Sequence, residues 1–341
     1  MRKLSIDTLR GFACILLVAY HVIGNDSFAG LRLHGDQLLP QINDVLALLR
    51  MPLFSFLSGF VYAWRPYNGD ASTFLKGKVR RLLIPLLLVG TLFAGLQVIT
   101  PGVNAVRHDW HLLHIVPVAH YWFLESLFLI FLLTASLDRF ALMSTPRGFT
   151  MVWLFAVLVF LLNPMPIYFG LQGATYLLPF FLLGLGCNRF AERLPRAPVM
   201  LLTAALMAGL GLYLVFVAHN VPDRTDIASL VIGASACVFL LRCRFEIRWL
   251  AWIGVYSFAI YLFHSMFSAA SRIALIRLDV SSIAILFSAG LAAGIAGPIV
   301  LAMVLRRLPW GHLPLGESKP KPQRAPRPLE QYRDPGYPKR N

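Results

Sequence analysis

The sequence predicts an all-α protein that crosses a membrane about ten times, with both termini in the cytoplasm. Hydrophobic residues make up 57% of the 341 residues and charged residues only 14%, and the mean hydropathy is +0.67. Soluble domains carry much more charge than this. Apolar segments of about 16 to 25 residues also recur along the chain, and this length crosses a hydrocarbon core of about 30 Å.

Ten segments meet this criterion, and in chain order they cover residues 8–24, 42–64, 83–100, 120–137, 149–164, 167–188, 198–218, 227–241, 249–267 and 281–305. The first segment is not expected to be a cleaved signal peptide. A charged pair, Asp7 and Arg10, interrupts its start, and it lacks a small-residue cleavage site.

The distribution of Lys and Arg predicts the orientation of these segments. With the N-terminus inside, the inner flanks carry sixteen basic residues before the tail, whereas the outer loops carry five, which are Arg32, Arg107, Arg224, Arg272 and Arg277. Cytoplasmic loops are enriched in Lys and Arg, so both termini are predicted to be cytoplasmic. The net charge of +15 then reflects contact with anionic headgroups and requires no nucleic acid.

Two units are expected along the chain. Residues 1–307 form the transmembrane domain, and residues 308–341 form a basic, Pro-rich cytoplasmic tail that is predicted to be disordered. The four cysteines, Cys14, Cys187, Cys237 and Cys243, lie in spans or at inner ends without zinc-like spacing. They predict neither a disulfide nor a metal site.

The first segment carries the most informative pair of residues. Arg10 and His21 are eleven positions apart, which places them on one helix face with a rise of about 16 Å between them. Ionisable groups inside a membrane are costly and usually functional, so both are candidate catalytic residues. The alternative for His21 is a packed interhelical hydrogen bond.

A second candidate is Glu125, the acidic residue that lies well inside a predicted span. Trp122 lies three positions earlier and therefore on the same helix face. This pair predicts a pocket wall in which Trp122 is a stacking surface and Glu125 a polar anchor. Alternatively, Glu125 is a carboxylate near water at a helix end or pairs with a basic neighbour.

In the ninth segment, Ser257, Tyr261 and His264 share one face at spacings of four and then three residues. The predicted depth of His264 is similar to that of His21. Two histidines at one depth, each with polar neighbours, predict a buried polar site.

A basic run lies on the predicted cytoplasmic side and includes Lys78, Arg80 and Arg81. It is either a topology signal or a cradle for phosphates, to which Arg offers bidentate contacts and Lys a point charge. The chain has no Gly-rich phosphate-binding motif, so side-chain charge would have to hold a nucleotide.

Taken in order, these motifs resemble the integral-membrane acyltransferase-3 family, which O-acylates bacterial cell-surface glycans. The matching pieces are Ile6-Asp7-x-Leu9-Arg10-Gly11 followed by His21, Met51-Pro52-Leu53-Phe54-Ser55-Phe56-Leu57-Ser58-Gly59-Phe60, Lys78-x-x-Arg81-Leu82-Leu83-Ile84-Pro85, Trp122-Phe123-Leu124, Phe180-Phe181-Leu182-Leu183-Gly184, and Ser257-Phe258-x-x-Tyr261-Leu262-x-His264. Together they cover about residues 1–305.

The resemblance implies a ten-helix enzyme of the bacterial inner membrane. It would take an acyl group, usually acetyl, from cytoplasmic acyl-CoA and deliver it to a sugar hydroxyl outside. His21 matches the residue proposed to be catalytic in the family, and Arg10, Lys78 and Arg81 match residues associated with acyl-CoA. Lys78 stands where Arg is common and lacks its planar fork.

Some members of the family carry a fused extracytoplasmic esterase-like domain. The sequence shows no such domain, so direct transfer or a separate extracytoplasmic acyl-transfer protein is expected.

We therefore predict a membrane O-acyltransferase in which His21 is a general base or a transient acyl carrier. The candidate catalytic residues are His21, Arg10 and Glu125, and the candidate substrate-binding residues are Lys78, Arg80, Arg81, Asp7, Trp122, Ser58, Tyr261 and His264. The expected partners are acyl-CoA as donor substrate, a glycan or lipid-linked saccharide as acceptor, and the lipid bilayer, with no bound cofactor, metal or nucleic acid.

The main alternative is a proton-coupled transporter or flippase for a glycolipid or anionic substrate. His21, Glu125 and His264 could then form a proton relay. The segments show no inverted repeat of the kind that many transporters carry, which favours the enzyme.

Overall fold

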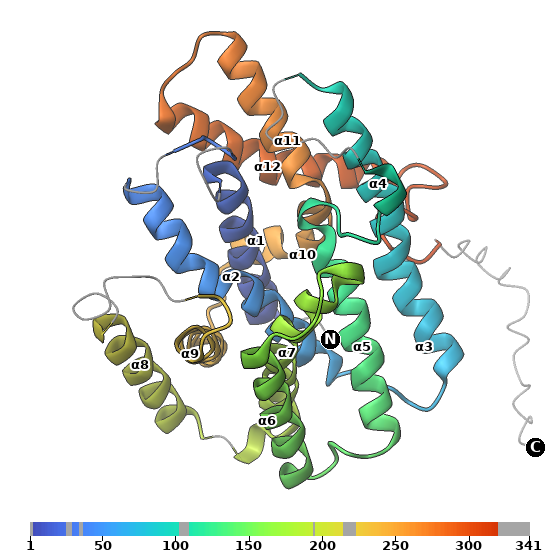
Figure 1. The fold of residues 1–341 in the computed structure, drawn as a ribbon, viewed down its shortest axis with the longest axis vertical. Helices are drawn as coiled ribbons and strands as arrows, with labels where there is room; N and C mark the ends of the chain where they lie inside the picture. Colours follow the sequence, from blue (N-terminus) through green and yellow to red (C-terminus); the bar gives the residue numbers. More distant parts are fainter. Residues whose placement is uncertain are drawn as a thin grey trace, which may run out of the picture.

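The computed structural model describes residues 3–24, 29–33, 37–101, 109–193, 195–213 and 223–319. Every regular element within these ranges is helical (Figure 1), and a lone bridge pairs Leu113 with Val116. The all-α prediction is therefore confirmed.

The helices in the described ranges are α1 (Leu4–Ile23), α2 (Leu38–Tyr62), α3 (Ala71–Lys78), α4 (Ile84–Ile99), α5 (Trp122–Arg139), α6 (Pro146–Leu162), α7 (Leu171–Arg189), α8 (Arg196–Tyr213), α9 (Ile227–Cys243), α10 (Arg248–Val255), α11 (Ser257–Arg277) and α12 (Ile283–Leu305). A π-helical turn, η1 (Val79–Leu83), joins α3 to α4. Four 3₁₀ turns complete the set, namely η2 (Trp110–Leu112), η3 (Ala119–Tyr121), η4 (Tyr168–Gly170) and η5 (Ala191–Arg193).

The described helices confirm a polytopic membrane architecture. Seven of them are long and apolar enough to cross a bilayer: Leu4–Ile23, Leu39–Tyr62, Ala71–Ile99, Ala119–Arg139, Tyr168–Arg189, Ser257–Arg277 and Ile283–Leu305. An eighth candidate is the pair α9 and α10, which is bent by 119°. The apolar helices α6 and α8 are shorter than these spans.

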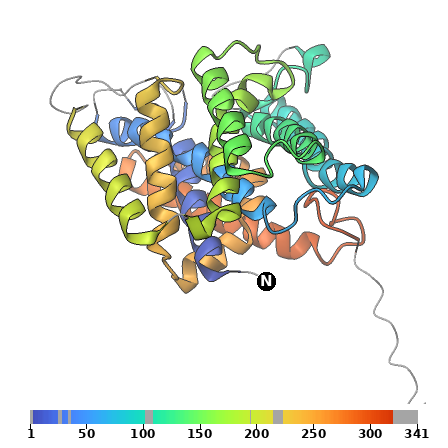
Figure 2. The ribbon, with the colours of Figure 1, turned by 90° about the horizontal axis from the view of Figure 1, so that it is seen from below.

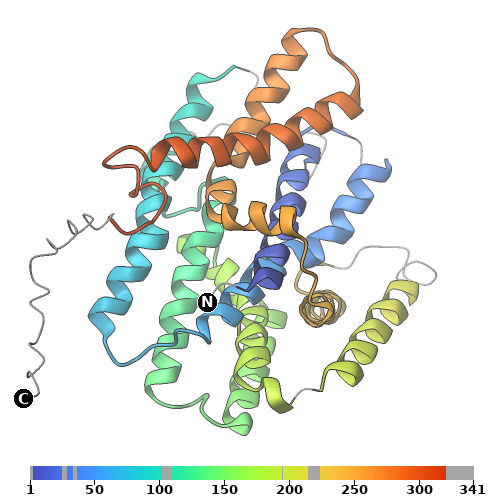
Figure 3. The ribbon, with the colours of Figure 1, turned by 180° about the vertical axis from the view of Figure 1, so that it is seen from behind.

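The predicted segment 249–267 differs most from the structure. It is divided at Tyr256, where the backbone leaves helical geometry, so that α10 and α11 are separate helices. In Figure 3, α9 is seen end-on while α10 lies across the view. Hydropathy alone cannot show this break, because the residues on both sides of Tyr256 are mostly apolar.

Two pairs of glycines allow helix backbones to touch. A Cβ at Gly11 would overlap the carbonyl of Leu250, and one at Gly254 would overlap the carbonyl of Asp7, so α1 and α10 meet at both positions. Gly59 and Gly184 bring α2 and α7 together in the same way. Small residues at helix crossings permit such close packing in membranes.

Side-chain contacts tie further helices together at one end of the bundle. Arg189 on α7 donates to Asp138 on α5 at 3.0 Å, and the hydroxyl of Tyr62 on α2 donates to the same carboxylate at 2.8 Å. At an edge of the molecule, α8 and α9 run side by side (Figure 2).

The folded part extends beyond the expected boundary at residue 307. Leu315 is 4% exposed and belongs to the main hydrophobic core, and Glu317 pairs with Arg306 at 2.7 Å. This burial of an apolar side chain holds residues 308–317 against the helices. Residues 320–341, the rest of the predicted tail, lie outside the described residues.

Candidate active site

A cavity of about 1400 Å³ lies between the ends of several helices. Its lining includes Tyr20 and His21 from α1, Arg50 from α2, Trp122 from α5 and Tyr261 from α11. Aromatic rings and a few polar side chains thus face one space, which is typical of a small-molecule site.

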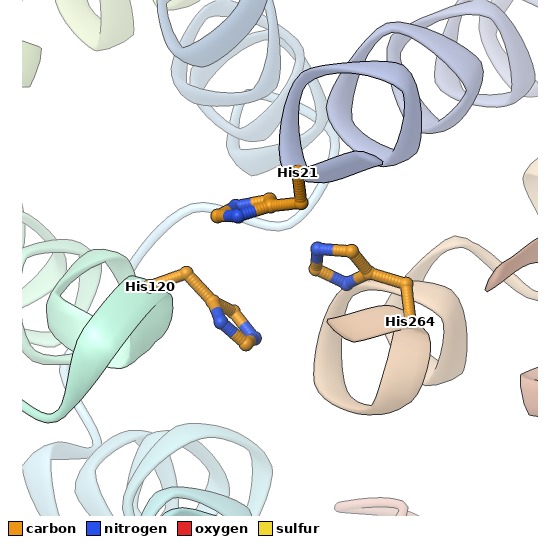
Figure 4. Close-up of side chains that lie close together, drawn as sticks. All are labelled: His21, His120 and His264. Carbon is orange, nitrogen blue, oxygen red and sulfur yellow. The ribbon is translucent and has the colours of Figure 1, made fainter. Parts of the chain in front are cut away.

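Three histidines converge at this cavity from distant parts of the chain (Figure 4). The ring centroid of His21 lies 4.8 Å from that of His264 and 5.3 Å from that of His120, and the latter two are 4.7 Å apart. His21 and His120 line the cavity, whereas His264 is fully buried behind them.

Hydrogen bonds between tyrosines and backbone carbonyls hold η3 against α11. The hydroxyl of Tyr121 donates to the carbonyl of Leu262 at 2.7 Å, and the hydroxyl of Tyr261 donates to the carbonyl of His120 at 2.5 Å. This reciprocal pair fixes His120 beside His264. Buried hydroxyls of this kind generally require such partners.

The hydrogen bonds also indicate which ring nitrogens are protonated. His120 Nε2 lies 3.1 Å from the carbonyl of Tyr261, and His264 Nδ1 lies 2.8 Å from the carbonyl of Ile260. Because a carbonyl only accepts, both nitrogens are assigned as donors in the neutral rings. His120 Nδ1 and His264 Nε2 are then acceptors.

Both acceptor nitrogens face the hydroxyl of Ser265, which also lines the cavity. Its Oγ lies 3.1 Å from His264 Nε2 and 3.4 Å from His120 Nδ1. One hydroxyl hydrogen cannot serve both nitrogens at once. The cluster therefore retains the capacity to accept a proton.

The same histidines are the group of described residues that could hold a metal ion. One nitrogen from each of His21, His120 and His264 lies within 4.8 Å of the others. The bonds from His120 and His264 to carbonyls resemble the outer contacts of metal ligands. Zinc is held at about 2.0–2.1 Å from each nitrogen, so the rings would have to close around an ion.

Of the residues predicted from sequence, the structure brings His21, Trp122, Tyr261 and His264 together around the cavity. Glu125 is 6% exposed and lies behind the cavity wall, where its Cβ packs against Gly170. Gly170 itself lines the cavity. Glu125 is thus one residue removed from the open space.

Arg10 and Asp7 lie at the opposite end of α1 from His21. They form an ion pair of 3.2 Å, and neither lines the cavity. Ser58 is also absent from the lining, and its hydroxyl donates to the carbonyl of Phe54 within α2 at 2.8 Å.

The basic run divides into two environments. Lys78 turns inward, with its Nζ 3.3 Å from the ring centroid of Phe131 and 5.0 Å from that of Phe74. Arg80 and Arg81 are exposed on η1. The run therefore presents two guanidinium groups at the surface and one ammonium group among aromatic rings.

Sequence reasoning missed His120, Ser265 and Arg50. Arg50 carried a usable signal, since a charged residue lies inside an otherwise apolar predicted span. His120 is the first residue of the predicted segment 120–137, where a polar side chain is ordinary, and Ser265 resembles an ordinary helical serine. Only tertiary contacts reveal their roles.

The fold and the cavity together define a polytopic membrane protein with a histidine cluster beside an internal space. The chain belongs to the acyltransferase-3 family, because the family model described as an acyltransferase domain matches residues 3–307. The protein is therefore a multi-pass membrane acyltransferase. Searches of curated proteins and of solved structures give no significant match.

Proposed function

We propose that the protein transfers an acyl group, with acetyl expected, from cytoplasmic acyl-CoA to a sugar hydroxyl. The acceptor would be an extracytoplasmic polysaccharide or its lipid-linked precursor, and the membrane would be the bacterial inner membrane. The observation that carries the proposal is the position of His21 at the cavity, within a chain of the acyltransferase-3 family.

In this reaction His21 acts as general base. It takes the proton of the sugar hydroxyl while the hydroxyl oxygen attacks the thioester carbonyl of acyl-CoA. The carbon–sulfur bond breaks, and the leaving thiolate takes the proton back from the imidazolium. The products are a sugar ester and free CoA. In the alternative route, His21 first carries the acyl group itself.

His120 and His264 lie beside His21, and hydrogen bonds to the backbone of α11 orient both rings. Their donor nitrogens are engaged by carbonyls of α11, so the other nitrogen of each ring faces the hydroxyl of Ser265. The rings of both histidines pack against the ring of His21, with centroid distances of 5.3 and 4.8 Å, and so hold its imidazole in position during transfer.

The donor would bind at the other end of α1. Arg10 on α1 and Arg80 and Arg81 on η1 supply positive charge for the phosphates of CoA. Lys78 would join them by turning out from the rings of Phe131 and Phe74. The Lys and Arg distribution predicts that this end is cytoplasmic. Acyl-CoA carries its acyl group at the end of a long flexible arm, which suits a separation of about 16 Å between Arg10 and His21.

The test is mass analysis of surface glycan from a deletion strain. Loss of an acyl mass, restored by the wild-type gene, is the expected result. An unmodified glycan that fails to reach the surface would instead support a flippase. Transfer of label from acetyl-CoA by the purified protein identifies the donor, and labelling of a second purified protein would reveal an acyl-transfer partner.

A further inference from the structure

We propose that the cavity binds its acceptor through an oxyanion held by Arg50 and Arg224. The oxyanion would be the carboxylate of an acidic sugar or the phosphate of a lipid-linked saccharide. That the bound molecule is the acceptor rests on the proposed function, whereas the anion site rests on the geometry of the two arginines.

Arg50 is a guanidinium in the interior of α2. It is 3% exposed, lines the cavity, and donates from Nη2 to the backbone carbonyl of Asn43 at 2.6 Å and to its side-chain oxygen at 3.0 Å. Its Nε is buried and has no hydrogen-bond partner among the described residues. A charge within a membrane helix is costly unless an opposite charge accompanies it.

Arg224 approaches the same place from the turn before α9. It lines the cavity, and its Nη2 lies 3.5 Å from the hydroxyl of Tyr20. The ring of Tyr20 also carries the guanidinium of Arg50, 4.1 Å from its centroid. Tyr20 therefore stands between two cations, with its ring on one and its hydroxyl on the other.

Neither arginine forms an ion pair with a described carboxylate. Within the described ranges the ion pairs are Arg10–Asp7, Arg189–Asp138 and Arg306–Glu317, so neither Arg50 nor Arg224 has a carboxylate within 4.0 Å. Asp223 lines the cavity and Asp44 is exposed nearby on α2. Two guanidinium groups without a paired carboxylate favour a bound oxyanion, which Arg224 can contact in a bidentate manner and Arg50 through Nη1, because Nη2 of Arg50 is engaged by Asn43.

The position of the pair connects it with the chemistry. Tyr20 precedes His21 directly, and the two rings form an edge contact with centroids 5.0 Å apart. Gln172 and Tyr176 of α7 line the same cavity and offer hydrogen bonds to sugar hydroxyls, while Trp122 offers a stacking face. An anion at Arg50 and Arg224 would thus anchor a saccharide beside the proton-accepting histidine.

The experiment measures equilibrium binding of three probes in the absence of acyl-CoA. The probes are methyl glucuronide, which carries a carboxylate, glucose 1-phosphate, and neutral methyl glucoside. Thermal stabilisation of the purified protein reports affinity for each. The variants are Arg50→Gln and Arg224→Gln, and the control is Arg277→Gln, which is exposed at the end of α11 and does not line this cavity.

We expect the wild type to bind at least one anionic probe about tenfold or more tightly than the neutral glucoside. Each cavity variant should lose that preference, and Arg277→Gln should keep it. Preference for the glucuronide points to an acidic sugar, and preference for the phosphate points to a phosphate-bearing saccharide. Equal affinities in the wild type, or an unchanged preference in either cavity variant, would overturn the proposal.

A second measurement on the same purified protein distinguishes failure of this inference from failure of the proposed function. Release of CoA from acetyl-CoA is measured with each probe as acceptor. An anion preference without acyl transfer leaves the site intact and counts against the proposed function. Acyl transfer without any anion preference leaves the function intact and overturns the anion site.

Discussion

At the scale of single residues, the environment of His21 depends on carbonyl groups of one helix. α11 engages His120 through the carbonyl of Tyr261 and His264 through that of Ile260, which orients both rings. Neither bond involves a charged side chain. The tautomers of His120 and His264 are therefore set by backbone geometry that a sequence does not display.

Glu125 gives the first prediction. Glu125→Gln keeps the size of the side chain behind Gly170 but removes its charge, so acyl transfer should fall far more than protein abundance in the membrane. Both are measured on one membrane preparation. Glu125→Leu is the comparison: if the Gln variant is fully active and only the Leu variant is destabilised, the carboxylate has a structural role.

Part of the candidate site follows from sequence and part does not. His21, Tyr261 and His264 are predictable because ionisable and polar residues are unusual at such positions in apolar segments. His120 is not predictable, because it joins the cluster through the contact of η3 with α11 rather than through any local pattern. Ser58 was predicted to bind substrate but does not line the cavity. It lies beside Gly59, which packs α2 against α7.

At the scale of elements, several family motifs position helices rather than substrates. Gly11, Gly59 and Gly184 each stand where a neighbouring backbone leaves no room for a side chain. The apolar segments around these glycines predicted the helices correctly, because long apolar runs mark membrane spans. It did not predict the bend between α9 and α10, which depends on how α10 packs across α1.

Gly59→Ala tests this packing. Its Cβ would overlap the carbonyl of Phe181, so we expect a loss of about 1–3 kcal/mol in unfolding free energy. The matched control is Gly95→Ala in α4, where a Cβ meets nothing within 4 Å and Ala should be neutral or stabilising. Thermal unfolding in detergent compares them, and equal midpoints would contradict the role of the glycine.

The basic run gives a prediction at the same scale. The double variant Lys78→Ala with Arg81→Ala should bind CoA about ten- to hundredfold more weakly, because a charged contact is typically worth about 1.5–3 kcal/mol. Binding is measured by titration of CoA into purified protein, and membrane insertion is checked in parallel. Normal CoA affinity in the double variant would reduce the run to a topology signal.

At the scale of the whole molecule, the basic residues expected to bind CoA and the residues of the cavity lie in different places. Arg10 and the exposed arginines of η1 lie away from the cavity, while the histidines and Arg50 surround it. Hydropathy and charge counts predicted the membrane class and the order of the spans. They could not predict the cavity, whose lining comes from α1, α2, α4, α5, α7, α11 and α12.

The central claim is that His21 accepts the proton during acyl transfer, and His21→Asn tests it most directly. Asn can replace one hydrogen bond of the imidazole but cannot take up a proton. Transfer of labelled acetyl from acetyl-CoA to glycan from a deletion strain is measured for the purified wild type, His21→Asn and the control His111→Asn, whose side chain is exposed. The account predicts at least about a hundredfold loss for His21→Asn with CoA affinity unchanged. Near-normal transfer by His21→Asn would contradict it.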